Sequence, residues 1–544
     1  HRHMSRVRDI YDGLLVEQAV GMKEKKDELE LLLSLDVTAE ESEYVLAKEG
    51  FRDPRNAFRN VLLLRDGSAG SSLTPRSRSM FVTVIPVLIS GCAASPDPDM
   101  AINNLESFVT SYGSREALVE LINGRPESAG LITRLFGSSE YFSRMLISRP
   151  EMADTLLFSG GVPLPRSKEE LAAELADWLS SEDGMAGRMD AMRKFKHAEE
   201  IRVGLRDLYE DPGYRAVANG LVDMAEVVLD AVLGIAYSDT ASRYGYPGGR
   251  VQPGGTAVAG LGKLGGRELI YGSDLDIFFI HEKAGRTTGP EKISGPEFYS
   301  RLAERVLYAL SSLTREGFVF RVDTRLRPGG SKGVLSHTLD SLKKYYMNTA
   351  SLWELQALTR ARPVAGDSAL CGGFEALRTE ILSMPRDRDT LAREVLAMRM
   401  RIEKELGRSK GGLNIKHGAG GIVDVEFIVQ YLQLLHWADI PELAVPDTAA
   451  ALDALASSDL IPEGGGGVIK ESYGFFRELE SKIRIFTGQS GSVLPEDGKG
   501  LAILAARMGY GNRGEHAPRM LVADYRGRAV KVREVFMKVM GVSA

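Results

Sequence analysis

The sequence predicts a mostly helical α+β protein, with a small α/β core between an N-terminal helical region and a C-terminal helical bundle. Three observations predict this order. In residues 5–242 apolar side chains recur at intervals of three, four and seven, which is typical of helices packed on their neighbours. In residues 246–366 glycine is frequent and short β-branched and aromatic runs occur, which predicts strands. In residues 367–544 the helical spacing returns.

The N-terminal region is predicted to be a scaffold or docking surface, because its sequence shows no group of residues with a chemical role. We expect residues 1–4 to remain from cloning and residues 5–110 to form a helical linker or docking region. Residues 111–245 are expected to be the helical part of the module that contains the core. Helices are predicted at residues 81–89, 101–112, 169–179 and 220–237.

The core, residues 246–366, contains the predicted strands and is followed by the C-terminal bundle, residues 367–544. Strands are predicted at residues 256–259, 276–281, 318–323 and 333–336. Two helices, at residues 265–271 and 296–314, are predicted to connect them. In the bundle, helices are predicted at residues 391–406, 422–437, 468–486 and 522–540.

The composition excludes several classes of protein. A chain of 544 residues has room for three or four domains, and 44% hydrophobic with 26% charged residues is ordinary globular usage. The net charge of −6 disfavours a dedicated nucleic-acid binder. Two distant cysteines, Cys92 and Cys371, support neither a disulfide framework nor a zinc site, and no apolar run reaches 18 residues. We therefore expect a cytoplasmic protein that binds neither nucleic acid nor membrane.

A glycine-rich turn follows the first predicted strand. Residues 260–266, GLGKLGG, match the GxGxxG pattern of dinucleotide-binding folds. The context disfavours such a fold. A parallel crossover needs about a dozen or more residues, and fewer than that lie between this turn and the segment that begins at Gly272. Two interpretations remain. The segment is either a plain glycine turn or a turn whose amides approach a phosphate chain, with Gly262 in the turn and Lys263 as a point charge.

The segment GSDLD, residues 272–276, lies at the start of a hydrophobic strand. Because residues i and i+2 of a strand share a face, Asp274 and Asp276 are presented side by side and repel each other unless a cation lies between them. Mg²⁺ prefers such carboxylates together with substrate phosphates. Gly272 and Ser273 would offer a backbone N–H and a hydroxyl to a phosphate. The alternative makes Asp274 a turn or cap residue and Asp276 an ion-pair partner.

A third carboxylate, Asp323, ends the strand predicted at residues 318–323. If that strand pairs beside residues 276–281, Asp323 completes a two-cation site for in-line displacement at phosphorus, or accepts a proton from the attacking hydroxyl. Arg325 and Arg327 follow and are placed to neutralise phosphate charge. A surface ion pair is the alternative for Asp323.

Later segments add candidates, each with a structural alternative. Lys416 lies in a glycine-rich loop before an apolar helix, which predicts either an anion site or ordinary helix initiation. Arg360 and Arg362 are predicted either to contact a nucleotide or to form structural ion pairs. Asp424 and Glu426 are two residues apart, so on a helix they do not share a face and make poor joint metal ligands.

Taken together, these segments resemble a known family. GSDxD followed by a distant strand carboxylate is similar to the DNA polymerase β-like nucleotidyltransferase fold. Four ordered blocks resemble glutamine synthetase adenylyltransferases in particular. They are GKLGGRELIYGSDLD (262–276), VDTRLRP (322–328), WELQALTRAR (353–362) and KHGAGGIVDVEF (416–427). Residues 51–158 resemble the same family more loosely.

The resemblance implies Mg²⁺-dependent transfer of AMP from ATP to a tyrosine hydroxyl of glutamine synthetase, with release of pyrophosphate. Family members carry two homologous halves, one attaching AMP and the other removing it by phosphorolysis. One GSDLD core occurs here, so the chain resembles one half, most closely the C-terminal adenylylating half. By the same resemblance, Asp274, Asp276 and Asp323 would hold two Mg²⁺ ions, and Gly272 with Ser273 would grip the triphosphate.

Other functions stay open at this point. The half that removes AMP would use phosphate and make ADP, and it shares the same carboxylates. A helical regulatory module that only senses ATP is disfavoured by the three intact aspartates. An RNA-modifying transferase is disfavoured by the acidic net charge. The resemblance also implies a PII-type nitrogen signalling protein and glutamine as effectors.

Overall fold

The computed structural model describes residues 29, 31–34, 36–67, 74–125, 127–153, 164–407, 412–462, 464–488 and 491–541. The predicted cloning remnant and the first helical positions, up to residue 28, lie outside these described residues. Internal contacts divide the chain into two compact units. Unit 1 consists of residues 1–163 and 485–488, and unit 2 of residues 164–484 and 489–544. The predicted division at residues 110, 245 and 366 stays a prediction.

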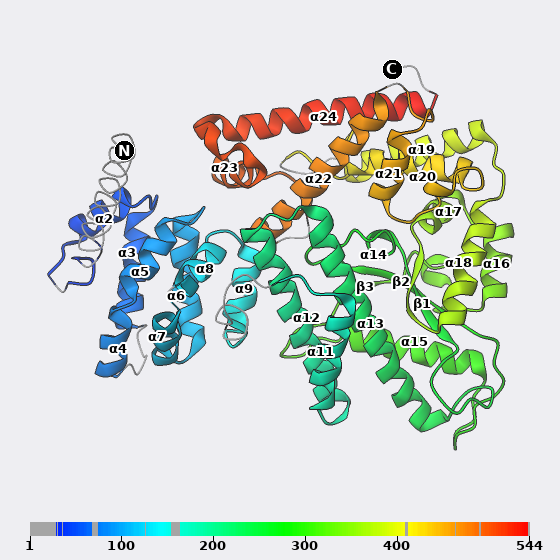
Figure 1. Cartoon of the computed structure of the whole chain (residues 1–544), viewed down its shortest axis with the longest axis horizontal. Coiled ribbons are helices and arrows are strands. Elements are labelled where there is room, and N and C mark those ends of the chain that lie inside the picture. Colours follow the sequence, from blue (N-terminus) through cyan, green and yellow to red (C-terminus); the bar gives the residue numbers. More distant parts are fainter. Residues whose placement is uncertain are drawn as a thin grey trace, which may run out of the picture. The chain divides into compact units, whose positions relative to one another are not determined.

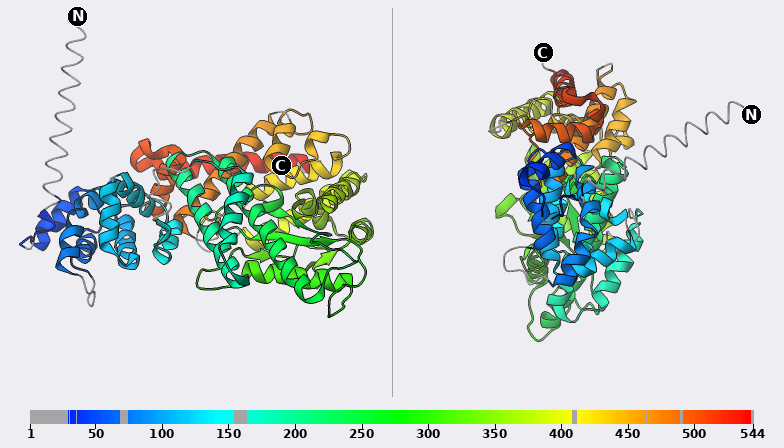
Figure 2. Two further views of the ribbon diagram at one scale, coloured as in Figure 1. Left: turned by 60° about the horizontal axis from the view of Figure 1, so that its bottom comes forward. Right: turned by 90° about the vertical axis from the view of Figure 1, so that its left-hand side faces the viewer.

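Unit 1 is helical wherever the structure describes it, and its helices lie side by side (Figures 1 and 2). One predicted helix, at residues 81–89, is wrong in its bounds. Pro86 lies in the first turn of a new helix, where its missing N–H is tolerated, so the chain breaks just before it. The helices are α2 (Ala39–Lys48), α3 (Pro54–Asp66), α4 (Pro75–Val82), α5 (Ile85–Ala93), α6 (Pro98–Tyr112), α7 (Arg115–Gly124), α8 (Glu127–Phe136) and α9 (Glu140–Ser148).

Unit 2 contains a five-stranded mixed sheet with the order β3-β2-β1-β5, and β4 pairs with β2 off this path. The central strand β1 is antiparallel to both β2 and β5, whereas β2 is parallel to β3 and β4. The strands are β1 (Thr256–Gly260), β2 (Leu275–His281), β3 (Val322–Asp323), β4 (Ser336–His337) and β5 (Arg362–Gly366). This small sheet between helices confirms the predicted mostly helical α+β class (Figure 1).

Two strand predictions differ from the structure, and one strand was not predicted. The strand predicted at residues 318–323 is reduced to β3, because the N–H groups of Val319 and Phe320 both donate to the carbonyl of Leu310 instead of to a strand. The strand predicted at residues 333–336 begins only at Ser336. The sequence analysis did not predict β5, although Pro363 within it favours an extended chain.

Helices cover both faces of the sheet. Alternate strand residues such as Ala259, Phe278 and Ile280 belong to one hydrophobic core with residues of the C-terminal helices, among them Ile428 and Tyr473. The remaining face is met by helices α13 and α15. The helices before and within the sheet region are α11 (Lys168–Ser180), α12 (Gly184–Tyr209), α13 (Tyr214–Tyr244), α14 (Gly262–Gly265), α15 (Gly295–Ser311), α16 (Leu339–Asn348) and α17 (Leu352–Thr359).

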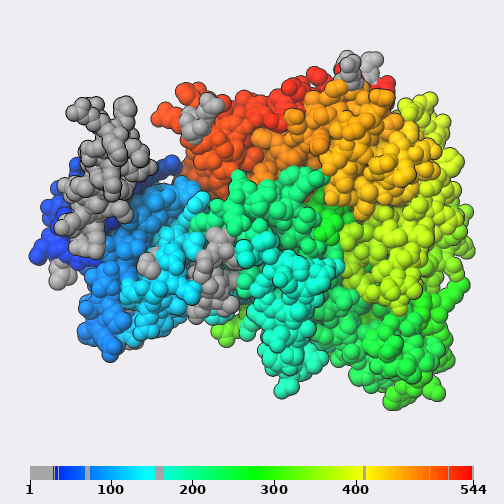
Figure 3. Space-filling view, in the orientation of Figure 1, coloured from blue at the N-terminus to red at the C-terminus, as the bar shows by residue number. Residues whose placement is uncertain are grey.

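The C-terminal helices return to the segments that precede the sheet. In the space-filling view, orange C-terminal residues meet green residues that precede the sheet (Figure 3). Lys482 of α22 forms an ion pair with Asp207 of α12. No helix within the described ranges has the length and apolar character needed to cross a membrane. These helices are α18 (Ser368–Leu382), α19 (Arg388–Leu406), α20 (Ile422–His436), α21 (Thr448–Ala456), α22 (Gly465–Thr487), α23 (Gly498–Ala505) and α24 (Ala517–Val539).

Candidate functional site

The structure brings the three predicted carboxylates to one end of the β2–β3 pair. In the parallel register Asp276 lies opposite Asp323, so the two side chains share a face of the sheet. Asp276 lies two residues before Phe278 on β2, so the two side chains point to the same face of the sheet. That face packs against the C-terminal helices. Asp274 immediately precedes β2 and is exposed to solvent. Asp276 and Asp323 thus share one face of the strand pair, whereas Asp274, predicted to lie beside Asp276 on the strand, precedes it.

The environment of Asp276 disfavours its negative charge. Burial, with the charge of Asp323 acting in the same direction, raises the pKa of Asp276 to about 6, and Lys416 is the first of the cations that oppose the shift. A buried carboxylate next to a second acid is stabilised when a cation joins it. The electrostatics of this strand end therefore favour a bound cation.

Asp323 already has a cationic neighbour. Arg325 Nε lies 3.0 and 2.9 Å from the two carboxylate oxygens, and the Arg325 backbone N–H donates to Oδ1 at 2.8 Å. These hydrogen bonds lower the pKa of Asp323, whereas its partial burial opposes the effect. The Arg325 side chain is 78% exposed, so it is accessible to an anionic ligand from solvent.

The glycine-rich turn packs directly against Asp276. The Leu261 N–H donates to the Asp276 carbonyl oxygen at 2.8 Å. Gly262 has φ +53°, and a β-carbon at this position would collide with Asp276 Oδ2. The short helix lies at Gly262–Gly265 rather than at the predicted residues 265–271, since Arg267 has φ +54° and ends it.

Replacing Gly262 by alanine is expected to displace the Asp276 carboxylate. We expect Gly262→Ala to weaken binding of Mn²⁺ about tenfold or more, because disturbing the groups that orient a metal ligand typically costs about 10–100-fold in metal affinity. Electron paramagnetic resonance of free Mn²⁺ measures this. Gly249→Ala is the matched control: its φ is +78° and a β-carbon there meets nothing within 4 Å, so it adds backbone strain without a collision. Equal Mn²⁺ affinity in the two variants would contradict the prediction.

Lys263 is engaged inside the protein. Its Nζ lies 3.0 Å from Glu480 Oε1 on α22, and the two side chains are 15% and 0% exposed. Glu480 also accepts hydrogen bonds from Arg477 at 2.6 Å and from Ser492 at 2.9 Å. Burial lowers the pKa of Lys263 to about 7, against the opposing charge of Glu480.

Two predicted arginines are likewise bonded to protein groups. Buried Arg327 donates to the carbonyl oxygens of Thr324, Ser331 and Gly333 and so fixes the loop after β3. Buried Arg360 forms ion pairs with Glu268 and with Glu426, the latter at 2.9 Å. The structural alternative for Arg360 is therefore realised in this structure.

The remaining candidates flank the same strand end. Lys416 is half-buried, and no ion pair of its side chain occurs among the described residues, although its charge acts on Asp276 and Glu480. Gly272 is exposed with φ +63°. Ser273 Oγ accepts the N–H of Ile270 at 3.1 Å, which closes the turn before β2.

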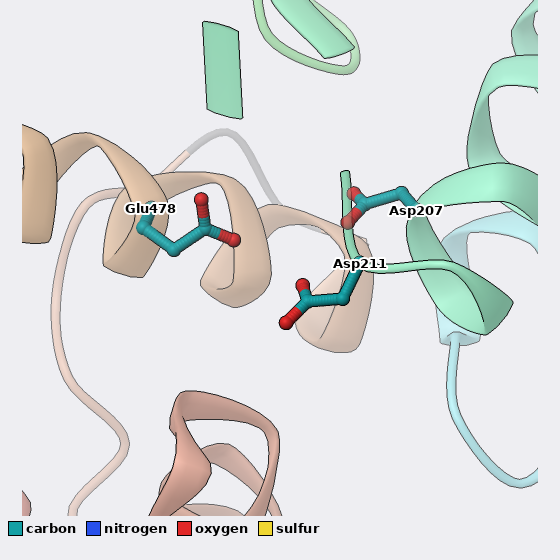
Figure 4. A group of neighbouring side chains, drawn as sticks. All are labelled: Asp207, Asp211 and Glu478. Atoms are coloured by element: carbon teal, nitrogen blue, oxygen red, sulfur yellow. The ribbon is translucent and has the colours of Figure 1, made fainter. Parts of the chain in front are cut away.

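The sequence analysis missed one acidic cluster. One carboxylate oxygen from each of Asp207, Asp211 and Glu478 lies within 4.8 Å of the other two. Figure 4 shows the three side chains. No spacing signal could have revealed it, because helices α12 and α22 are distant in the sequence. Lys482 pairs with all three acids, lying 2.9 Å from Glu478, and therefore supplies the compensating charge. Tyr271 donates to Asp207 at 3.1 Å, which links this network to the GSDLD segment.

The fold and the site together define a mostly helical α+β protein with a nucleotidyltransferase core. Residues 129–376 match the family model described as "Glutamate-ammonia ligase adenylyltransferase", and residues 396–540 match the one described as "GlnD PII-uridylyltransferase". Residues 129–376 of this chain are therefore similar to the glutamine synthetase adenylyltransferase family.

Two curated relatives show the same similarity. Both are named bifunctional glutamine synthetase adenylyltransferase/adenylyl-removing enzyme. The protein from Thioalkalivibrio sulfidiphilus is 36% identical over 84% of this chain and 48% of its own length. The protein from Pseudomonas putida is 32% identical over 80% of this chain and 47% of its own length. The chain thus spans about half the length of these relatives.

Proposed function

We propose that this chain transfers AMP from ATP to a tyrosine hydroxyl of glutamine synthetase and releases pyrophosphate. The observation that supports this best is the register of Asp276 opposite Asp323, with Asp274 beside them and the glycine turn packed on Asp276. Three acids at a strand end suit hard cations that also bind phosphates. The names of the relatives supply the substrate.

In this proposal Asp274, Asp276 and Asp323 hold Mg²⁺, with two ions expected. The donor set fits, because it consists of carboxylate oxygens and because the charge of Asp276 is disfavoured until a cation is present. When bound, Mg²⁺ supplies charge neutralisation and orientation for in-line displacement at the α-phosphorus. Asp323 is also the group proposed to accept the proton of the tyrosine hydroxyl.

The other predicted residues are proposed to bind the nucleotide. Gly272, Ser273 and Gly262 offer backbone groups near the carboxylates. Lys416 and the exposed Arg325 offer positive charge to the triphosphate. A nucleotide contact for Lys263, Arg327 or Arg360 stays a prediction, because each would have to exchange protein partners.

The choice between the two halves of the family is also part of the proposal. The blocks at residues 353–362 and 416–427 favour the adenylylating half. The relatives' names include an adenylyl-removing activity, so phosphorolysis that gives ADP is the second candidate. We further propose a cytoplasmic location, with a PII-type protein and glutamine as effectors, and neither nucleic acid nor membrane as a partner.

The test incubates the chain with α-labelled ATP, Mg²⁺ and unmodified glutamine synthetase. We expect label on the synthetase and release of pyrophosphate, and we expect chelation of Mg²⁺ by EDTA to abolish both. In a parallel reaction the chain receives adenylylated synthetase and inorganic phosphate. ADP formation there, without labelling in the first reaction, would replace the proposal with the second candidate. Activity in neither reaction would favour a module that senses ATP.

A further inference from the structure

Helix α22 holds both the glycine-rich turn and the residues that follow it. Within the turn, Lys263 Nζ lies 3.0 Å from Glu480 Oε1. Just after the turn, Arg477 donates to the backbone carbonyl of Glu268, whose own N–H donates to the Lys263 carbonyl at 2.7 Å. Arg477 also donates to Glu480 at 2.6 Å. One face of α22 thus clamps residues 263–268.

This clamp is buried, and its charged groups contact one another. Glu480 is fully buried, the Arg477 side chain is 1% exposed, and Ser492 donates a further hydrogen bond to Glu480 at 2.9 Å. Removing one member of a buried ion pair is costly because the other charge is left uncompensated. The Lys263 amine is therefore held by the protein and is not free to follow a ligand.

The opposite side of the same turn faces the proposed metal site. A β-carbon on Gly262, the residue before Lys263, would collide with Asp276 Oδ2. The Leu261 N–H holds the Asp276 carbonyl at 2.8 Å. The position of the turn therefore sets the position of the Asp276 carboxylate, and α22 sets the position of the turn.

We propose that Lys263 is a positioning residue, whose pair with Glu480 fixes the glycine turn against Asp276 and thereby tunes binding of the divalent metal. The inference rests on the proposed function, because it requires a metal at Asp276. It competes with the triphosphate contact that the sequence predicts for Lys263. It also gives the C-terminal bundle a direct physical link to the metal site through α22.

The experiment measures the affinity for the fluorescent nucleotide N-methylanthraniloyl-ATP, once with EDTA and once with Mn²⁺. The ratio of the affinity in Mn²⁺ to the affinity in EDTA measures how much the bound metal strengthens nucleotide binding. We expect Lys263→Met to lower this ratio about tenfold, in keeping with the cost of a small misplacement, and to leave the affinity in EDTA unchanged. Lys263→Arg, which still reaches Glu480 with a cation, is expected to restore most of the ratio. Glu480→Gln is expected to act in the same direction as Lys263→Met.

Lys168→Met is the matched control. Lys168 also pairs with a buried glutamate, Glu226. When Lys168 is replaced, Glu226 keeps its arginine partner, just as Glu480 keeps its own when Lys263 is replaced. Lys168 does not touch the glycine turn among the described contacts. Because the Lys168 side chain is 44% exposed and that of Lys263 only 15%, we expect a smaller shift of the thermal unfolding midpoint in Lys168→Met, with the Mn²⁺ ratio altered in Lys263→Met alone.

The outcomes separate the possible failures. An equal loss of affinity in EDTA and in Mn²⁺ would show that Lys263 contacts the triphosphate and would overturn the positioning role. An unchanged ratio in Lys263→Met would overturn it as well. If Asp276→Asn leaves the Mn²⁺ ratio of the wild type intact, the proposed metal site fails, and this inference fails with it.

Discussion

Asp276→Asn is expected to lower the proposed transfer of AMP to glutamine synthetase by a factor of about 1,000 while the protein stays folded. Loss of a ligand to the proposed Mg²⁺ would remove several kcal/mol of transition-state stabilisation, and each 1.36 kcal/mol is about tenfold in rate. The measurement is the rate of label incorporation from α-labelled ATP. Asp340→Asn, an exposed aspartate on α16 paired with Lys283, is the matched control and is expected to retain full activity.

The stability of the same variant is expected to be equal or higher near pH 7.5. Burial raises the pKa of Asp276 to about 6, above its value in the unfolded chain. The folded state therefore binds the proton more tightly, and stability falls as the pH rises from about 4 to 6 and the carboxylate ionises. The neutral asparagine removes this cost. Urea unfolding at pH 7.5 measures it, and a large loss of stability would show that the lost activity reports misfolding instead.

The main features of the fold and the acidic site could be predicted from sequence because they are encoded locally. The strand at residues 275–281 is marked by consecutive β-branched and aromatic residues, and Asp274 and Asp276 are marked by their position at its start. The role predicted for Asp323 depended on its strand pairing beside the strand that contains Asp276. The parallel register of β2 and β3 meets that condition, and the role of Asp323 itself stays a prediction. Local pattern was sufficient wherever one strand or one turn decides the geometry.

Residue partners across the fold could not be predicted in the same way. Lys263 finds Glu480 more than 200 positions away, and a sequence read in one dimension gives no sign of that pair. Residues 318–321 have strand-forming side chains. However, the N–H groups of Val319 and Phe320 donate to the carbonyl of Leu310 near the end of α15. In each case tertiary contacts, rather than local propensity, decide the outcome.

A second large effect is expected on stability, from Arg360→Met. Arg360 follows α17 and joins Glu268, after the glycine turn, to Glu426 on α20. All three side chains are at most 12% exposed. Losing the arginine leaves two buried carboxylates without their cation, which typically costs about 3–5 kcal/mol of unfolding free energy. Urea unfolding followed by circular dichroism measures this loss.

Two companion variants make that result specific. Arg243→Met breaks an exposed pair with Glu291, whose side chains are 63% and 55% exposed, and no measurable change is expected. The triple variant Arg360→Met/Glu268→Gln/Glu426→Gln removes the stranded charges, so most of the lost stability should return. An unchanged unfolding midpoint in Arg360→Met would contradict the structural role.

The triple variant also decides the question that the sequence left open for Arg360. If this side chain only ties the glycine turn to α20, restoring stability should restore the affinity for ATP. If it also contacts the nucleotide, the stable triple variant should still bind ATP weakly, because the guanidinium is gone whatever the stability. The structure favours the first result, since both carboxylates that surround Arg360 come from the protein and the side chain is only 7% exposed.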